Sequence, residues 1–138
     1  MSGMRVMIFA FDGSRNNPNL PENHVENAVV FTGTHETNTV RGWFVDEINN
    51  EQKKHIYEYL GKRVSEEQIC SEMVKLAIGS RAKLSIIPIQ DVLSLGSEAR
   101  INHPSRQLNN WQWRVTSEQL ASRRIEMLGK LTEDFNRE

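Results

Sequence analysis

His35 and Glu36 are adjacent polar residues whose side chains together could bind a sugar ring and stabilise a developing positive charge. They follow the apolar run AVVFTG, residues 28–33, whose β-branched side chains end at a glycine. A second interpretation makes the pair an ordinary polar turn before a helix, because a helix dipole favours an acidic side chain near its N-terminus. Residue types and spacing leave both interpretations open.

Elsewhere the chain lacks the spacings of the common catalytic and metal-binding motifs. Neither HExxH nor GxSxG occurs, and the four histidines, His24, His35, His55 and His103, are scattered. The single cysteine, Cys70, lies on an apolar stripe and is expected to be a buried small residue. We therefore expect no metal and no organic cofactor.

Two tryptophans and an arginine are further candidates for ligand contacts. Trp111 and Trp113 would point the same way in an extended segment, where they could stack on sugar rings or anchor a long loop on the core. The sequence favours the second role, in which the tryptophans anchor the loop on the core. Arg100 could contact hydroxyl groups or pair with Glu98 or Asp91, and structural pairing is favoured.

Strands and helices alternate along the chain and would position these residues. Short apolar runs bounded by turn residues predict buried strands at residues 5–11, 28–33 and 83–89. Helices are predicted after a cap at Thr37 or Asn38, at residues 50–60 before a capping glycine, and from capping boxes that open at Ser65 and Thr116. The last helix is expected to turn inward Leu120, Met127, Leu128, Leu131 and Phe135. This order predicts an α/β fold with about three parallel strands and flanking helices.

Polar stretches follow the predicted strands, at residues 12–27, 34–38 and 96–114. Because the carboxyl ends of parallel strands meet at one edge of a sheet, these loops are expected to come together there. They are rich in Asn, His, Trp and Arg. The sequence therefore predicts a site for a polar, uncharged ligand at this edge.

Length and charge narrow the class of protein. A chain of 138 residues is expected to form a single domain, residues 1–138. Its 17 basic and 18 acidic residues nearly balance, which argues against nucleic acid as a partner. The longest apolar stretch is far shorter than the roughly 20 residues of a membrane span, and the N-terminus lacks the pattern of a secretory signal. We expect a cytoplasmic protein that binds no membrane.

Five segments carry a resemblance to a known family: GMRVMIFAFDG, NPNLPEN, NAVVFTGTHETNTVRGWF, IIPIQDVLSLGSEARINHPS and NNWQWR. In this order, from about Gly3 to Arg114, they resemble the C-terminal part of the 4-α-glucanotransferases. These are the amylomaltases, or disproportionating enzymes, of glycoside hydrolase family 77. The resemblance implies the last third of an eight-stranded (β/α) barrel. Its sixth, seventh and eighth strands would be residues 5–11, 29–31 and 84–87.

The family transfers segments of α-1,4-glucan by a retaining reaction, in which a nucleophile and an acid/base lie about 5–5.5 Å apart. A third carboxylate binds ring hydroxyls and stabilises the transition state. The resemblance places Glu36 at this third position, where the family has Asp, and implies substrate contacts for Thr34, His35 and Asn102. The extra methylene of Glu36 moves its carboxylate by roughly 1 Å, a displacement that can cost about a hundredfold in rate.

The nucleophile and the acid/base of the family belong to the fourth and fifth strands, and no acidic residue of this chain matches them. We therefore expect a fragment that binds α-1,4-glucan or maltooligosaccharide but is inactive alone. Its first strand would expose an unpaired edge, which self-association or the missing N-terminal part of the barrel could cover. The alternative is a non-enzymatic module, derived from this family, that binds glucan or a protein partner.

Overall fold

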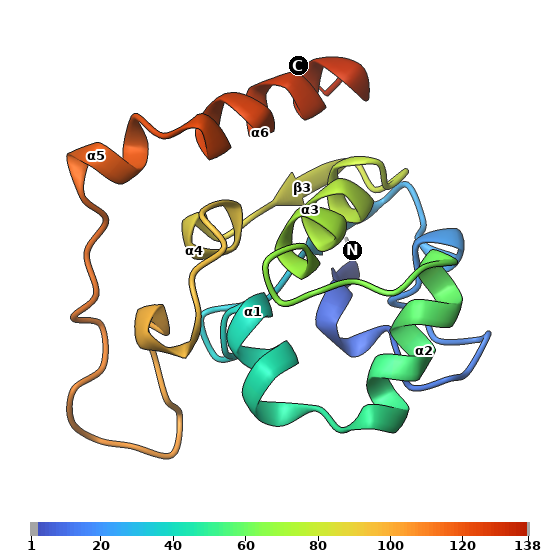
Figure 1. The fold of residues 1–138 in the computed structure, drawn as a ribbon. Helices are drawn as coiled ribbons and strands as arrows, with labels where there is room; N and C mark the ends of the chain where they lie inside the picture. Colours follow the sequence, from blue (N-terminus) through green and yellow to red (C-terminus); the bar gives the residue numbers. More distant parts are fainter. Residues whose placement is uncertain (1–2, 138) are drawn as a thin grey trace.

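In the computed structural model, which describes residues 3–137, parallel strands form one sheet (Figure 1). The strands are β1 (Gly3–Val6), β2 (Ala28–Phe31) and β3 (Leu84–Ile86), hydrogen-bonded in the order β1-β2-β3. In the register of the sheet, Val29 lies between Met4 and Leu84. The predicted α/β class, with three parallel strands and flanking helices, is confirmed.

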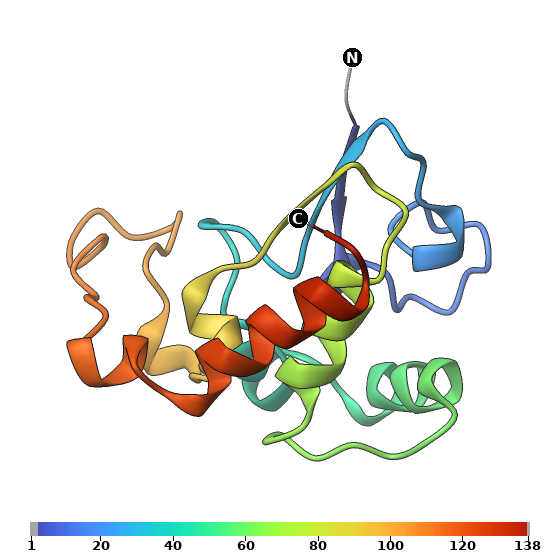
Figure 2. The same cartoon turned by 90° about the horizontal axis from the view of Figure 1, so that it is seen from above.

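Helices and helical turns form the connections between the strands. The connection from β1 to β2 contains the 3-10 turns η1 (Met7–Phe9) and η2 (Pro21–Asn23). After β2 come α1 (Val40–Gly42), the π-helical turn η3 (Trp43–Glu47), α2 (Asn50–Leu60) and α3 (Ile69–Ile78). After β3 come α4 (Ile89–Val92), η4 (Ser97–Ala99), α5 (Ser117–Leu120) and α6 (Arg123–Asp134). Figure 2 shows α6 crossing the outside of the fold next to α3, which it contacts.

The hydrophobic core lies between the sheet and α3. The predicted apolar stripe of this helix consists of Ile69, Cys70, Met73, Leu76 and Ala77. It is confirmed, since Leu76 is partly buried against the core and the other four are fully buried. They join Val30 of β2 in one apolar cluster. Full burial of a side chain the size of Ile or Met contributes about 1.5–3 kcal/mol, so this contact is a main support of the fold.

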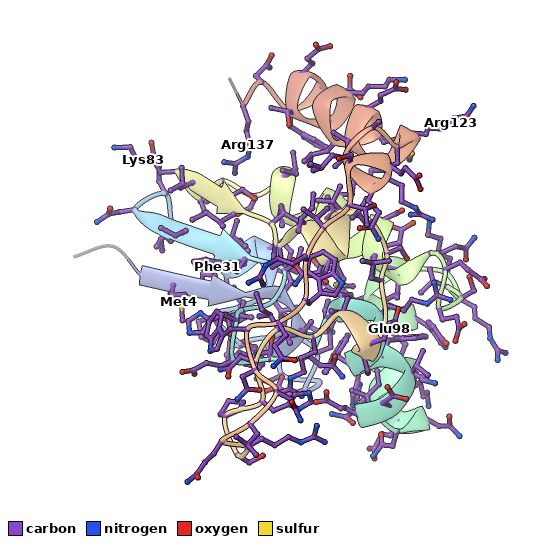
Figure 3. The ribbon with its side chains drawn as sticks, turned by 90° about the vertical axis from the view of Figure 1, so that its left-hand side faces the viewer. Met4, Phe31, Lys83, Glu98, Arg123 and Arg137 are labelled. Carbon is purple, nitrogen blue, oxygen red and sulfur yellow. The ribbon has the colours of Figure 1, made fainter. Side chains whose placement is uncertain are left out.

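The opposite face of the sheet is left largely open. Met4, Leu84 and Ile86 are 59%, 52% and 45% exposed. Met4 and Leu84 share a register position with Val29, and the alternation of side chains along a strand places Ile86 on the same face. Figure 3 shows Met4 on the outer strand β1. Apolar side chains gathered on an exposed face mark a surface that another polypeptide can cover.

The first strand is shorter than predicted. β1 ends at Val6, and the chain turns into η1 within the apolar run that the sequence predicts as one strand. Ile8 still donates its N–H to the carbonyl of Thr32 at 3.3 Å, so the turn stays beside the end of β2. The turn buries Met7 completely and leaves Phe9 53% exposed. A tertiary contact, and not local propensity, therefore decides where this strand stops.

The third strand and α3 also differ from their predicted limits. Only Leu84–Ile86 pair with β2, because Pro88 follows and is the N-cap residue of α4. Proline donates no N–H to a ladder and is favoured at helix starts. Ser65 does not open α3 directly. A turn comes first, in which Ile69 donates its N–H to the Ser65 carbonyl at 3.0 Å.

Two helix caps show how closely local signals set the ends of helices. The predicted bounds of α2 are confirmed, and Gly61 ends it with a left-handed φ of 73°. Before α1, the capping residue is Thr39 in place of the predicted Thr37 or Asn38. Its hydroxyl accepts the N–H of Gly42 at 3.1 Å.

The predicted last helix is divided, and its apolar side is poorly buried. Thr116 and Gln119 form the expected capping box, but α5 lasts only one turn before α6 begins. Leu128 and Leu131 are half-buried. Met127 lines the same recess beside α3 as these two leucines, and the Phe135 ring lies against Gly79, but the Met127 and Phe135 side chains remain 49% and 41% exposed. Leu120 is 51% exposed. The helix lies on the surface because α3 and the sheet have already enclosed the core.

Arg137 fastens the end of α6 to the body of the protein. Its guanidinium donates hydrogen bonds to the carbonyls of Ile78, Ser80 and Ala82, the last at 2.8 Å. These carbonyls belong to the end of α3 and to the connection into β3. Figure 3 shows Arg137 extending from the end of α6 toward the start of β3. A polar attachment thus adds to the partial apolar packing of α6.

Candidate functional site

A cavity of about 210 Å³ opens at the carboxyl ends of β2 and β3. The loop after β2 and the loop after β3 both contribute to its walls, as the sequence predicts for parallel strands. The lining residues are Gly33, Thr34, His35, Thr37, Asn38, Thr39, Pro88, Gln90, Asp91, Arg100, Ile101 and Trp111. The third predicted loop, residues 12–27, does not contribute to this cavity; part of it lines a separate one.

The loop after β2 forms a tight turn that displays the predicted pair. Thr34 donates its N–H to the Thr37 hydroxyl at 2.9 Å, and Glu36 donates its N–H to the Thr34 hydroxyl at 3.2 Å. These hydrogen bonds fix the backbone of the turn and leave the side chains of His35 and Glu36 pointing toward solvent. The side chains of His35 and Glu36 are 62% and 69% exposed, with His35 Nε2 and Glu36 Oε1 4.0 Å apart.

Trp111 lies beside His35, and the sequence alone did not indicate this contact. The ring centroids are 5.6 Å apart and the ring planes are tilted by 36°. Trp111 is 51% exposed, so the favoured prediction that it anchors the loop on the core is wrong. The segment is not extended here, because Trp111 has a φ of 62° and donates its N–H to the Ile101 carbonyl at 2.6 Å. Asn110 closes the same loop by accepting the N–H of His103 at 2.8 Å.

Arg100 connects the two loops. Its Nη2 donates to the backbone carbonyl of Glu36 at 3.0 Å, and its Nε donates to the carbonyl of Asn102 at 2.9 Å. Its charged partner is Glu47 at 3.9 Å, in place of the predicted Glu98 or Asp91. The prediction of a structural role is confirmed. The arginine holds the loop that carries Glu36 against the loop that carries Asn102.

Asp91 is the buried charge of the site. It is 1% exposed. Its Oδ2 accepts the hydroxyl of Thr32 at 2.6 Å and its Oδ1 accepts the N–H of Val40 at 2.8 Å. Burial raises the pKa of its carboxyl to about 6. Because Thr32 precedes the His35 loop and Val40 follows it, this one carboxyl holds both ends of the loop.

The sequence contains one signal for this role of Asp91. It stands inside the apolar run IIPIQDVL, just beyond the carboxyl end of a strand. An acidic residue at such a position is buried only when it has partners.

The predicted site residues occupy different positions around the cavity. Thr34 and His35 line it, whereas Glu36 and Asn102 do not. Glu36 lies beside the cavity, next to His35. Asn102 is half-buried, and its backbone carbonyl accepts a hydrogen bond from Arg100 Nε. The structure therefore brings the four residues into one region, with two of them in the cavity wall.

This arrangement supplies an aromatic face, hydroxyl and amide groups and an imidazole around a small opening. Such a mixture suits a neutral polyhydroxylated ligand. Within residues 3–137, His, Cys, Asp and Glu side chains form no cluster of three or more that could hold a metal ion. In that same part of the chain, none of the helices has the length and apolar character needed to cross a bilayer.

Comparison with known proteins connects this geometry to a family. The 4-alpha-glucanotransferase family, glycoside hydrolase family 77, matches residues 1–120 of the chain. A chloroplastic or amyloplastic 4-alpha-glucanotransferase of Solanum tuberosum is 46% identical over 115 residues, which are 83% of this chain and 20% of that protein. The 4-alpha-glucanotransferase of Aquifex aeolicus is 40% identical over 136 residues, which are 99% of this chain and 27% of that protein.

A solved structure agrees with these sequence matches. The amylomaltase from Streptococcus agalactiae in complex with acarbose superposes with a TM-score of 0.90 at 31% sequence identity. The match covers 99% of this chain and 28% of that one. The chain therefore spans between a fifth and about a quarter of the length of these relatives.

Proposed function

The chain belongs to the 4-alpha-glucanotransferase family, and from this premise we propose that it forms the sugar-ring-binding part of a glucan-transferring site. The observation that carries the proposal is the cavity at the carboxyl ends of β2 and β3, where His35 faces Trp111 at a centroid distance of 5.6 Å. The ligand would be an α-1,4-glucan or a maltooligosaccharide. The Streptococcus agalactiae relative is described in complex with acarbose, which supports this ligand class.

We assign roles to the four predicted site residues and to Trp111. His35 would bond a ring hydroxyl, Trp111 would contact the apolar face of the ring, and Thr34 would contribute its side chain from the cavity wall. Glu36 would stabilise positive charge at the reacting carbon. Its carboxylate lies outside the cavity but is 69% exposed, so a rotation about its side-chain bonds can bring it to a bound ring. Asn102 would complete the contacts from the second loop.

We propose that residues 1–138 form one domain and correspond to the C-terminal segment of a (β/α) barrel. The parallel order β1-β2-β3 and the exposed apolar face around Met4 and Leu84 support this assignment. A complete barrel takes about 250 residues and encloses such a face as its packed interior. The remaining strands would then come from further polypeptide, in the same protein or in a partner.

Transfer of a glucan segment needs a nucleophile and an acid/base in addition to the stabilising carboxylate. Among the described residues, the carboxylate in the cavity wall is Asp91, and it is buried and bonded to Thr32 and Val40. We therefore expect these 138 residues by themselves to transfer no glucan. Incubation of the purified chain with maltotriose should yield neither glucose nor longer oligomers. Robust turnover would refute this part of the proposal.

Binding is tested separately from turnover. Titration with maltotriose, followed by NMR, should shift signals of Thr34, His35 and Trp111. The variant His35→Ala should lose these shifts, whereas His103→Ala should keep them, because His103 does not line the cavity. A titration in which the cavity signals stay unchanged would contradict the assignment.

A second candidate function is protein interaction through the exposed side of the sheet. Met4, Leu84 and Ile86 favour it, because three large apolar residues share one exposed face. A stable oligomer that binds no maltooligosaccharide would favour this module over the sugar site.

For the location of the protein, we propose the cytoplasm on the basis of composition. The Solanum tuberosum relative is described as chloroplastic or amyloplastic.

A further inference from the structure

A second and larger cavity lies between the connection that follows β1 and helix α2. Its volume is about 510 Å³, within the range of about 300–1,000 Å³ that is usual for ligand pockets. Figure 1 shows the two segments, residues 10–22 and α2, side by side. The lining residues are Ala10, Phe11, Gly13, Ser14, Arg15, Leu20, Glu22, His55, Glu58 and Tyr59. None of them lines the cavity of His35 and Trp111.

Packing and hydrogen bonds fix the walls of this cavity. Phe11 and Tyr59 meet edge to face with centroids 5.6 Å apart. The Tyr59 hydroxyl donates to Glu22 Oε2 at 2.8 Å, which joins the connection to α2. Gly13 has a φ of 88°, and a Cβ there would lie 2.9 Å from His55 Cε1. The imidazole therefore packs where only a glycine leaves room for it.

The rim of the cavity carries both donors and acceptors that a ligand can use. Within residues 3–137, no hydrogen bond or ion pair involves the side chains of Arg15 and His55, and His55 has an electrostatic interaction with nearby Asp12. Glu58 has one cationic neighbour, Lys54, at 4.0 Å, and Glu22 retains acceptor capacity beyond the Tyr59 hydroxyl. The rim thus offers a guanidinium, an imidazole and two carboxylates.

The remaining walls and the charge balance restrict the ligand class. Phe11 and Leu20 are 5% and 6% exposed and give the cavity an apolar floor. Two carboxylates outnumber the one guanidinium at the rim, which disfavours phosphate and other anions. A pyranose ring has hydroxyls around its edge and an apolar C–H face, and so matches donors and acceptors placed above an apolar floor.

We propose that this cavity is a second saccharide-binding site, separate from the ring-binding site at His35. The choice of a neutral α-glucan as its ligand rests on the proposed function, whereas the site itself rests on the geometry above. Arg15 and Glu58 bond ring hydroxyls from opposite sides, and Tyr59 positions Glu22 for the same purpose. The site holds a glucan chain to the protein away from the reacting bond.

The test is an NMR titration of the full chain with maltotriose. The amide signals of Gly13, Ser14 and His55 should shift and saturate in the millimolar range. Arg15→Met removes a charged donor from an exposed side chain and should weaken the affinity measured at these signals about tenfold. Tyr59→Phe keeps the ring packed on Phe11 and should weaken it as well.

Controls distinguish this site from the ring-binding site. His35→Ala should abolish the shifts around Trp111 and leave those of Gly13 and His55 unchanged. The experiment can therefore contradict one binding site without contradicting the other. Tyr57→Phe alters a tyrosine of the same helix that does not line this cavity, and should change nothing. The proposal is overturned if the signals at Gly13 and His55 stay still, if Arg15→Met leaves their titration unchanged, or if inorganic phosphate shifts them in place of maltotriose.

Discussion

Asp91 is the residue on which the geometry of the candidate site depends most. Its carboxyl accepts a hydroxyl from the end of β2 and an N–H from the start of α1. Residues 33–39, among them His35 and Glu36, lie between these two attachment points. A buried carboxyl whose partners span a loop fixes both ends of that loop at once. Its loss would release the segment that carries the predicted sugar contacts.

Replacement of Asp91 by alanine should destabilise the fold. Asp91→Ala leaves the Thr32 hydroxyl and the Val40 N–H buried without a partner, and each such group costs about 1–3 kcal/mol. We expect the free energy of unfolding in urea to fall by about 2–5 kcal/mol, and the control Glu133→Ala on the exposed side of α6 to change it by less than about 0.5 kcal/mol. Equal effects of the two variants would contradict the role of Asp91.

The raised pKa of Asp91 also predicts a pH dependence. The folded-state pKa is about 6, against an ordinary value of 3.8. A raised folded-state pKa means that its contribution to stability is fully present below pH 3.8 and is lost as the pH rises to about 6. Asp91→Asn resembles the protonated carboxyl, so unfolding free energies of this variant should lack that decrease. An unchanged pH profile in Asp91→Asn would argue against a buried titrating carboxyl.

His24 predicts a pH dependence of the opposite sign. It is 2% exposed, with Nε2 facing the Asn19 carbonyl at 2.8 Å and Nδ1 facing the Ser80 hydroxyl at 2.6 Å. Burial lowers its pKa from the ordinary 6.5. Its contribution to stability is therefore complete above pH 6.5 and is lost as the pH falls through the lower folded-state value.

Unfolding free energies measured from pH 8 down to pH 5 in the Asp91→Asn background isolate this histidine, because that variant lacks the titration of Asp91. Stability should be constant above pH 6.5 and decrease below it, by at most about 1.4 kcal/mol per pH unit for one titrating group. The decrease should be smaller when His24→Gln is added. If Asp91→Asn shows the same slope with and without His24→Gln, another group is responsible.

At the scale of elements, α6 differs from every helix that surrounds the core. It has no fully buried residue, and its firmest attachment is the guanidinium of Arg137 on three carbonyls. By contrast, α3 contributes Ile69, Met73 and Ala77 to the core, all fully buried. Elements with few buried apolar contacts open locally at lower free energy than the core. The two helices should therefore open independently.

Hydrogen exchange measured residue by residue checks this difference. Amides of α6 should exchange at least about tenfold faster than those of α3, a factor that corresponds to about 1.4 kcal/mol of local opening free energy. Arg137→Ala should accelerate exchange in α6 further and leave α3 unchanged. Arg123→Ala, at the other end of the helix, is the matched control and should have little effect. Equal protection of α3 and α6 would show that α6 belongs to the core.

At the scale of the whole molecule, the open face of the sheet is the dominant feature. β1 and β3 are both edge strands, and the apolar residues Met4, Leu84 and Ile86 lie exposed on one face. Unpaired strand edges next to apolar surface favour association with another chain. We propose that the chain self-associates through β1 and this face when no further barrel strands cover them.

Light scattering at micromolar concentration checks this prediction. The wild-type chain should have a mass above that of a monomer. Leu84→Lys should shift it toward the monomer, because a charge buried in an apolar interface is costly. Leu108→Lys is the control, since Leu108 is 77% exposed in the loop after β3 and not on the sheet. A monomeric wild type would contradict self-association.

Local signals in the sequence were sufficient for much of the fold. The bounds of α2 follow from the Asn49 capping box and from Gly61, whose left-handed φ ends the helix. The buried stripe of α3 follows from helical periodicity. The order of strands and helices predicts the parallel sheet. The two helix features depend on residues within a few positions of one another, and the order of elements is read directly along the chain.

The sequence by itself determined the family, the three strands in parallel order and the loop that carries Thr34, His35 and Glu36. Tertiary structure alone decided that Trp111 lies against His35, that Asp91 joins Thr32 to Val40, and that the first strand stops at Val6. Those contacts join residues that are distant in the sequence, and many pairings would satisfy the same local preferences. Only the packed chain selects among them, because burial and hydrogen bonding must be satisfied for all of the groups at once.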